Sequence, residues 1–148
     1  LGGDAPTVWE KNPSRQSGSV GYQVIDSGDD ARNDYSAICD VSGDGSLLNE
    51  FIQRMQPGGS IVLAGFYDQP LSFNFAPAFI RESCIKIAAQ WQTSDLDAVQ
   101  ALIKEEKLSL GGLISHRSSA SAAAPAYRQA FGDTDCLKMV INWRTNNE

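Results

Sequence analysis

Residues 57–67 read PGGSIVLAGFY, and this stretch decides the expected fold. Its centre, SIVLAGF, is almost continuously apolar, which is typical of a strand buried on both faces of a parallel sheet. Pro57, Gly58 and Gly59 stand directly before this run, and both residue types disfavour helix continuation. We therefore expect a helix to end at this triplet and a buried parallel strand to follow it.

The segments on either side of this stretch alternate between strand-like and helix-like patterns. Short β-rich runs predict strands near residues 6–10, 22–26, 35–41, 85–91, 113–117 and 137–143. Apolar residues at helical spacing predict helices over 46–55, from 94 onward and over 120–131. Strands that alternate with helices indicate an α/β fold with a mostly parallel sheet flanked by helices.

Charge and cysteine content exclude several classes of function. The net charge is −6 and no cluster of Lys and Arg occurs, so phosphate counterions would not be displaced and nucleic acid is not an expected partner. No run of 18 apolar residues predicts a membrane span. Cys39, Cys84 and Cys136 are widely spaced among apolar neighbours, and we expect reduced core thiols in a cytoplasmic protein.

Residues 39–50, CDVSGDGSLLNE, invite a metal or phosphate interpretation that fails at the decisive positions. A calcium loop that starts at Asp40 needs a bidentate Glu at its twelfth position, which is Phe51. A phosphate-binding loop needs Gly-Lys-Ser/Thr or a third glycine where this sequence has Leu47 and Leu48. Neither a metal site nor a phosphate loop is therefore predicted here.

The remaining interpretation is that this stretch is the end of a strand. In open α/β sheets, ligands bind beyond the carboxyl ends of the strands. Val41, Ser42 and Gly43 would lie at such an end, where small side chains let a cofactor approach the backbone. The alternative is that Ser42 and Gly43 only turn the chain into the next helix, and the sequence favours neither over the other.

Two further strand ends have a similar character. Glu10 follows the apolar run TVW, and an acidic residue in this place can accept the hydroxyl hydrogens of an adenosine ribose and repel a 2′-phosphate. Taken alone, a Glu at the end of a strand is more often merely solvated. Ala64, Gly65 and Phe66 end the strand of the opening stretch with small residues and an aromatic one. Three such ends in series favour a nucleotide-binding sheet.

The segment PGGSIVLAGFY, together with YSAICDVSG before it, resembles the medium-chain dehydrogenases/reductases. ISHR, AYRQAF and CLKMVINW resemble the closing segment of the same family, so the likeness covers nearly the whole chain. Within the family, the spacing of VWEKN, LSLGGLISHR and DCLKMVINWR is most similar to the members that oxidise the 1-hydroxyethyl group of chlorophyllide-type pigments. The resemblance implies a Rossmann-like fold and an alcohol dehydrogenase activity.

Residue roles and a cofactor also follow from the resemblance. Glu10 would bind the adenosine ribose and favour NAD, with Lys11 beside it on the adenine side. The segment of Val41, Ser42 and Gly43 would border the adenosine half of NAD, and the segment of Ala64, Gly65 and Phe66 would approach the nicotinamide half. These eight residues are the predicted cofactor site, the substrate is a tetrapyrrole, and a homodimer is expected.

The departures from the family limit these expectations. No G-x-G-x-x-G occurs, so the resemblance implies that the glycine-rich loop and the N-terminal catalytic domain precede Leu1 in a longer protein. Residues 1–112 would then be a truncated NAD-binding domain, and residues 113–148 a segment that packs toward the catalytic domain. No zinc-binding cysteine pattern is present, so no metal is predicted and the catalytic residues are unknown. The segment alone is expected to be inactive.

Alternatives remain open for several residues and for the function. His116 is a candidate acid/base group, but the resemblance implies a short strand and the start of a helix in this segment, which favours a structural or helix-entry role. Five aromatic residues could form a wall that receives a pigment face or could belong to the core: Phe66, Tyr67, Phe73, Phe75 and Phe79. The alternative functions are a zinc-independent, NADPH-dependent quinone reductase and a non-catalytic Rossmann-like fragment.

Overall fold

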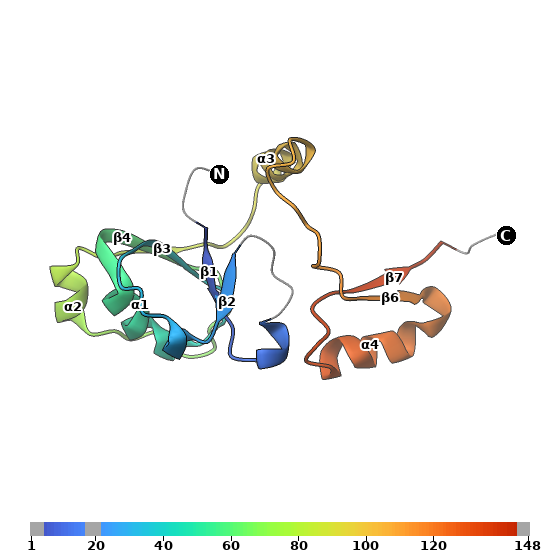
Figure 1. Ribbon diagram of the computed structural model, residues 1–148, viewed down its shortest axis with the longest axis horizontal. Helices are drawn as coiled ribbons and strands as arrows, with labels where there is room; N and C mark the ends of the chain where they lie inside the picture. Colours follow the sequence, from blue (N-terminus) through green and yellow to red (C-terminus); the bar gives the residue numbers. More distant parts are fainter. Residues whose placement is uncertain (1–4, 17–21, 145–148) are drawn as a thin grey trace. The chain divides into compact units, whose positions relative to one another are not determined.

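The computed structural model describes residues 5–16 and 22–144 of the chain. They form two compact units: one contains the described residues up to Asp30 together with those from Ser94 onward, and the other is Ala31–Thr93. Every strand pair in both units is parallel, and helices lie against the sheets, so the expected α/β, Rossmann-like class is confirmed (Figure 1).

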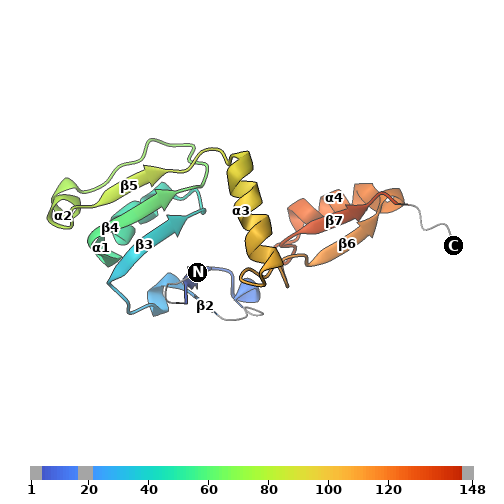
Figure 2. The ribbon, with the colours of Figure 1, turned by 90° about the horizontal axis from the view of Figure 1, so that it is seen from above.

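The unit Ala31–Thr93 is built on a three-stranded sheet with the order β3-β4-β5, in which the opening stretch supplies the central strand (Figure 2). β3 (Tyr35–Asp40), β4 (Met55–Leu63) and β5 (Cys84–Ile87) run in the same direction. The crossover between β3 and β4 contains a 3₁₀ turn, Gly45–Leu47, and α1 (Leu48–Arg54). α2 (Phe75–Ile80) lies between β4 and β5. The sequence predicted the helix of the first crossover, whereas α2 in the second crossover was not predicted.

The core of this unit lies between α1 and β4. Leu48, Phe51 and Ile52 form the buried stripe of α1. Met55, Ile61 and Leu63 of β4 are buried, and Met55 and Ile61 are fully inaccessible to solvent. Val62 is only half-buried, so β4 buries one face completely and the other in part. The buried side chains of α1, spaced as on one face of a helix, therefore pack against the buried, alternating side chains of β4 and form one hydrophobic layer.

The helix ends before Pro57, Gly58 and Gly59, as expected, but the triplet itself belongs to the strand that follows. α1 ends at Arg54, and the triplet lies inside β4 as an irregularity of the ladder, because Tyr35 pairs with Met55 whereas Ala37 pairs with Ser60. Gly58 has a φ of 73°, which favours glycine, and its amide donates a hydrogen bond of 2.8 Å to the carbonyl of Arg81. The residue types alone predicted the end of the helix but no strand over these three residues. The hydrogen bond to Arg81 keeps the bulged segment in the strand.

The second unit contains two separate pairs of strands. β1 (Thr7–Trp9) pairs with β2 (Gln23–Ile25), and β6 (His116–Ser119) pairs with β7 (Met139–Asn142). Hydrogen bonds within the described residues thus divide the strands into three sheets, all of them parallel, where the sequence predicted a mostly parallel sheet. β1 and β2 are three residues long, so each offers few backbone groups for further pairing.

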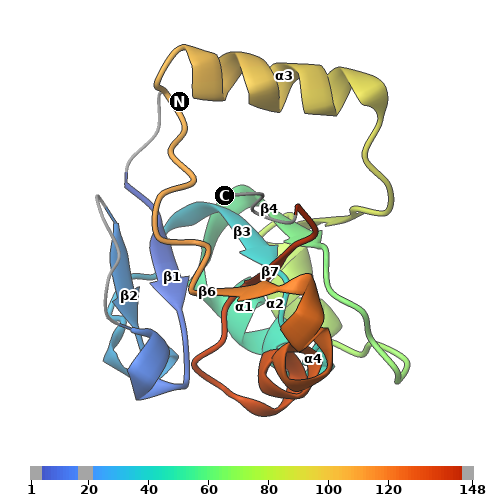
Figure 3. The ribbon, with the colours of Figure 1, turned by 90° about the vertical axis from the view of Figure 1, so that its right-hand side faces the viewer.

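Two helices complete this unit. α3 (Thr93–Lys104) is the helix that the sequence predicted from residue 94 onward (Figure 3). None of its residues is buried, so its predicted apolar face covers no core. α4 (Ala123–Gly132) follows a 3₁₀ turn, Ala120–Ala122, and lies against β6 and β7. Pro125 falls in the first turn of α4, where backbone amides have no intrahelical acceptor, and therefore the helix tolerates it.

The cysteines only partly follow the sequence-based expectation. Cys136 is buried, but Cys39 and Cys84 are exposed, so the prediction of three core thiols is wrong for two of them. Both exposed cysteines lie on strands of the β3-β4-β5 sheet, where apolar sequence neighbours occupy alternating faces. Apolar neighbours in sequence therefore did not predict burial of the residue between them.

Among the described residues, no helix is long and apolar enough to cross a membrane.

Replacement of Ile61 by Ala is expected to destabilise the protein by about 2–5 kcal/mol, because the side chain is fully buried and the change leaves a cavity. Ile87→Ala on the neighbouring strand is the matched control, since Ile87 is 78% exposed, and should change stability by less than about 1 kcal/mol. Urea unfolding of both variants measures the difference. Equal losses for the two variants would contradict the assigned core.

Candidate functional site

The carboxyl ends of β3 and β4 place two of the predicted cofactor segments side by side. Asp40 pairs with Leu63 in the last register of the parallel ladder, and the amide of Ala64 donates a 2.8 Å hydrogen bond to the carbonyl of Asp40. We call the segment 41–43 the first rim and the segment 64–66 the second rim. The rims leave the sheet at the same edge (Figure 2), as expected for parallel strands.

Two glycines let the rims touch through their backbones. An ideal Cβ on Gly65 would lie 2.7 Å from the backbone nitrogen of Gly43 and 3.3 Å from the carbonyl carbon of Val41. Gly43 has a φ of 76°, and a Cβ there would lie 2.5 Å from the carbonyl oxygen of Phe66. A side chain at either position would push backbone against backbone, so the glycines are required for the close approach.

The outer surface of the rims is apolar. Val41 is 74% exposed and Phe66 is completely exposed. Ser42 and Ala64 between them have small side chains that leave the backbone accessible at this edge. This combination of accessible backbone and exposed apolar side chains suits a flat ring flanked by polar groups, which is the character of small-molecule sites at sheet edges.

A buried carboxylate links the two rims. Asp40 is 5% exposed; its Oδ1 accepts a 2.9 Å hydrogen bond from the amide of Ser42, and its Oδ2 accepts one from the hydroxyl of Tyr67. Desolvation of the Tyr67 phenol and its hydrogen bond to Asp40 raise the pKa of Tyr67 to about 12. Neither Asp40 nor this role of Tyr67 was predicted, although an aspartate that ends an otherwise apolar strand is the signal in the sequence that would have found it.

The acidic and hydroxyl residues that resembled a calcium loop stabilise a turn. The amide of Asp44 donates a 3.0 Å hydrogen bond to Oγ of Ser42, and Oδ1 of Asp44 accepts one of 3.0 Å from the amide of Ser46. Such bonds to nearby amides are the usual role of Asp and Ser at a helix entry. The first rim is therefore the turn into the next helix, as one of the two interpretations that the sequence left open expected.

Glu10 and Lys11 belong to the other compact unit, where they directly follow β1. The amide of Glu10 extends the strand pairing through a 3.0 Å hydrogen bond to the carbonyl of Ile25. Oε1 of Glu10 accepts a 2.8 Å hydrogen bond from the amide of Asn12, which orients the half-buried side chain. A carboxylate has about four acceptor positions. This one therefore retains acceptor capacity for hydroxyl groups.

His116 occupies a structural position. Its amide donates to the carbonyl of Lys138 at 3.1 Å, and Nδ1 lies 2.9 Å from Oγ of Ser115. That same hydroxyl accepts hydrogen bonds from the amides of Leu137 and Lys138. The ring thus takes part in the hydrogen bonds that begin the pairing of β6 with β7. This arrangement favours the structural role over the catalytic one.

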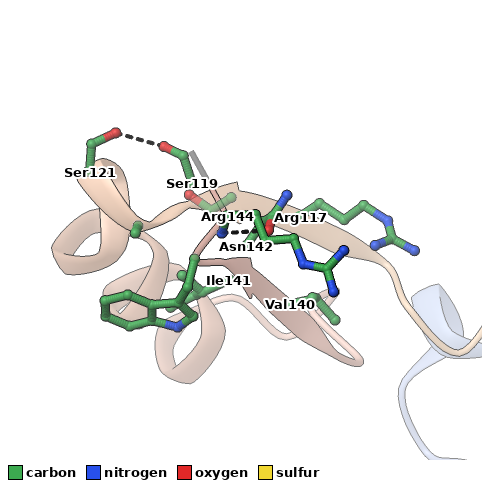
Figure 4. Close-up of a pocket in the computed structure, with 10 residues that line it drawn as sticks. Arg117, Ser119, Ser121, Val140, Ile141, Asn142 and Arg144 are labelled. Atoms are coloured by element: carbon green, nitrogen blue, oxygen red, sulfur yellow. Dashed lines mark hydrogen bonds between the residues drawn. The ribbon is translucent and has the colours of Figure 1, made fainter. Parts of the chain in front are cut away.

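A basic face, which the sequence analysis did not identify, lies on β6 and β7 (Figure 4). Met139 and Ile141 contribute to a hollow together with residues of α4, so the alternating Val140 and Asn142 point to the opposite face. Arg117, opposite Val140 in the ladder, lines this second face together with Arg144. Arg117 and Arg144 are 27 positions apart, so nothing in the sequence indicated that they would lie on one face.

The predicted aromatic wall is exposed in part. Phe75 and Phe79 on α2 are 70% and 69% exposed, and their ring centroids lie 5.7 Å apart. Phe73 is 44% exposed, whereas Tyr67 is half-buried through its contact with Asp40. These four residues and Phe66 therefore lie outside the core between α1 and β4.

Comparison with curated proteins identifies close relatives. The chain is 52% identical over 143 residues to a 2-desacetyl-2-hydroxyethyl bacteriochlorophyllide A dehydrogenase of Rhodobacter capsulatus, a match that covers 97% of this chain and 46% of the relative. It is 50% identical to the protein of the same name from Cereibacter sphaeroides, with coverage of 97% and 45%. The chain thus spans slightly less than half the length of these relatives. No family model matches the chain.

Comparison with solved structures identifies the fold. The 2R,3R-butanediol dehydrogenase of Bacillus subtilis superposes with a TM-score of 0.81 over 93% of this chain and 43% of its own, at 16% identity. L-idonate 5-dehydrogenase of Escherichia coli gives 0.76 over 93% and 42%, at 18% identity. An alcohol dehydrogenase of E. coli CFT073, complexed with NADH, gives 0.66 over 73% and 32%, at 21% identity. The expected resemblance to medium-chain dehydrogenases is confirmed in sequence and in fold.

Replacement of Gly65 by Ala is expected to destabilise the protein by about 1–3 kcal/mol, because the new Cβ would meet backbone atoms of the first rim. Gly132→Ala is the control, since a Cβ at Gly132 meets nothing within 4 Å, and should change stability by about 0.5 kcal/mol or less. Thermal unfolding measures both. A Gly65→Ala variant as stable as the control would show that the rims do not touch.

Proposed function

We propose that this chain contributes the cofactor-binding part of an NAD-dependent dehydrogenase that acts in bacteriochlorophyll synthesis. The observation that carries the proposal is the identity of 52% and 50% to two proteins named as bacteriochlorophyllide dehydrogenases, over 97% of this chain. The reaction would oxidise the 3-(1-hydroxyethyl) group of a chlorophyllide-type pigment to an acetyl group. In more general terms, the protein would be an oxidoreductase that uses a nicotinamide cofactor.

The rims support a nicotinamide cofactor. Gly43 and Gly65 keep side chains away from the edge where β3 and β4 end, which leaves backbone accessible to a bound nucleotide. Val41 and Ser42 would border its adenosine half, while Ala64 and Phe66 would approach the nicotinamide. One structural relative of this fold was solved with NADH. The residues present thus fit the cofactor that the proposal requires.

Glu10 supports NAD over NADP. Its side chain is oriented by the amide of Asn12 and retains acceptor positions, so it suits the two hydroxyl groups of a ribose. A 2′-phosphate near this carboxylate would be repelled, which disfavours the alternative of an NADPH-dependent quinone reductase. Lys11 directly follows and would lie on the adenine side.

The chemistry divides between the cofactor and the protein. NAD, when bound, would supply the hydride acceptor for oxidation of the secondary alcohol to a ketone, and the hydroxyl proton would pass to a base. In this chain the rims would fix the nicotinamide against the substrate, and exposed apolar groups such as Phe66 would exclude water from the ring. We assign no proton acceptor within residues 1–148.

The aromatic side chains offer a surface for the pigment. Phe66 in the second rim and Phe73 are exposed, and they are the aromatic residues proposed to meet the pigment beside the nicotinamide; the exposed Phe75 and Phe79 lie on α2, at the end of the sheet where β4 and β5 begin (Figure 2). A tetrapyrrole is flat and largely apolar, so contact with such rings would stabilise its binding.

We further propose that residues 1–112 are part of the NAD-binding domain and that residues 113–148 pack toward a catalytic domain. The proposed protein is a homodimer in the cytoplasm.

Glu10→Gln in the intact enzyme is expected to weaken NAD binding and to raise the affinity for NADP relative to NAD by about tenfold or more, because the charge that repels the 2′-phosphate is removed. Glu105→Gln is the control, since Glu105 pairs only with the exposed Lys107 and should leave both affinities unchanged. Fluorescence titration with NAD and NADP measures the ratio. A wild-type preference for NADP would contradict the role of Glu10.

The pigment assignment has a direct spectroscopic test. Incubation of the intact enzyme with NAD and the hydroxyethyl pigment should red-shift the pigment absorption, because the new acetyl carbonyl is conjugated with the macrocycle. NADH should form in equal amount, which a parallel assay without pigment controls. If a protein that binds NAD leaves the spectrum unchanged, the substrate is a different alcohol; if it binds no nicotinamide nucleotide, the non-catalytic alternative holds.

A further inference from the structure

We infer that Asp40 and Tyr67 are positioning residues that hold the two rims at the spacing a nicotinamide cofactor requires. This inference rests on the proposed function and adds a residue pair to the eight positions of the predicted site. It concerns only the unit Ala31–Thr93, in which both residues and both rims lie.

Asp40 contacts both rims through three separate groups. Its carbonyl accepts a hydrogen bond from Ala64 at the start of the second rim. Its Oδ1 accepts one from the amide of Ser42 in the first rim, and its Oδ2 accepts one from the hydroxyl of Tyr67, directly after the second rim. One residue thus determines where each rim leaves its strand.

The burial of Asp40 argues that this arrangement serves more than packing. A carboxylate that is 5% exposed loses most of its hydration, and an apolar residue at the same place would avoid that loss. The loss is offset because both carboxylate oxygens receive donors. The carboxylate accepts hydrogen bonds from both the amide of Ser42 and the phenol of Tyr67 and so connects them. An apolar residue could not do this.

Tyr67 has a counterpart elsewhere in the chain that lacks this role. Tyr127 on α4 is 54% exposed and stacks its ring on Phe131, with centroids 6.4 Å apart. Tyr67 is half-buried, and its hydroxyl is committed to Asp40. Removal of the hydroxyl from Tyr67 therefore breaks the side-chain link between Asp40 and the residue after the second rim, whereas the same change at Tyr127 leaves the rims as they are.

The rims touch so closely that a small displacement matters. A hypothetical Cβ on Gly65 would lie 2.7 Å from the nitrogen of Gly43, so the two backbones have little room to move toward each other. The link through Asp40 limits movement in the other direction, because it ties the residue after the second rim to the strand that leads into the first. Contact in one direction and hydrogen bonds in the other together set the spacing.

The test uses the intact enzyme and the variants Tyr67→Phe, Asp40→Asn and their combination. Tyr67→Phe should raise the Kd and the KM for NAD about tenfold, since it removes one hydrogen bond to a charged acceptor, while kcat at saturating NAD changes less. Asp40→Asn keeps one acceptor oxygen and should have a smaller effect. The double variant should be little worse than Tyr67→Phe alone, because both changes act on one link.

Two control variants carry the same chemical changes at sites outside the rims. Tyr127→Phe removes an exposed hydroxyl, and Asp34→Asn removes an exposed carboxylate that pairs with Arg32. Both should leave the Kd for NAD unchanged. Melting temperatures of all variants separate loss of fold from loss of positioning.

Each outcome has one interpretation. If Tyr67→Phe lowers the melting temperature but leaves the Kd of the folded protein for NAD unchanged, the pair is merely structural and the inference is overturned. Additive effects in the double variant would also overturn it, since the two residues would then act independently. A wild-type enzyme that binds no nicotinamide nucleotide overturns the proposed function itself, which is distinguishable because the variants then have nothing to lose.

Discussion

The parallel ladder between β3 and β4 is the constraint on which the candidate site depends. Because the strands run in the same direction and end in register at Asp40 and Leu63, the segments that follow must leave the sheet side by side. The burial of Ile61 and Leu63 against α1 holds β4 in that register. A shift by one residue would turn these side chains to the other face and would separate the rims.

Backbone contact and a buried carboxylate act together at this edge. The glycines at 43 and 65 permit the rims to approach, and Asp40 with Tyr67 ties them in place. Neither feature would suffice alone, because glycines without a link leave a flexible turn and a link without glycines meets a steric clash. Small-molecule sites on α/β sheets depend on this kind of rigid, accessible backbone.

Several features were predictable from the sequence because they depend on local pattern. The apolar run 60–66 predicted the central strand, and the stripe of Leu48, Phe51 and Ile52 predicted α1. The likeness to medium-chain dehydrogenases was also readable from short motifs. The triplet at 57–59 correctly indicated the end of α1, but its place inside β4 was not predicted, because the contact of Gly58 with Arg81 forms only in the folded chain.

The sequence by itself determined the seven described strands, their mostly parallel character and three of the four described α-helices, α2 being the exception, since periodicity and residue size are local properties. Tertiary structure alone decided that the rims touch, that Asp40 is buried between them and that Cys39 and Cys84 are exposed. The physical reason is that burial and contact depend on the register of β3 with β4 and on the helix packed against it. The register brings together residues more than 20 positions apart in the chain, such as Asp40 and Leu63.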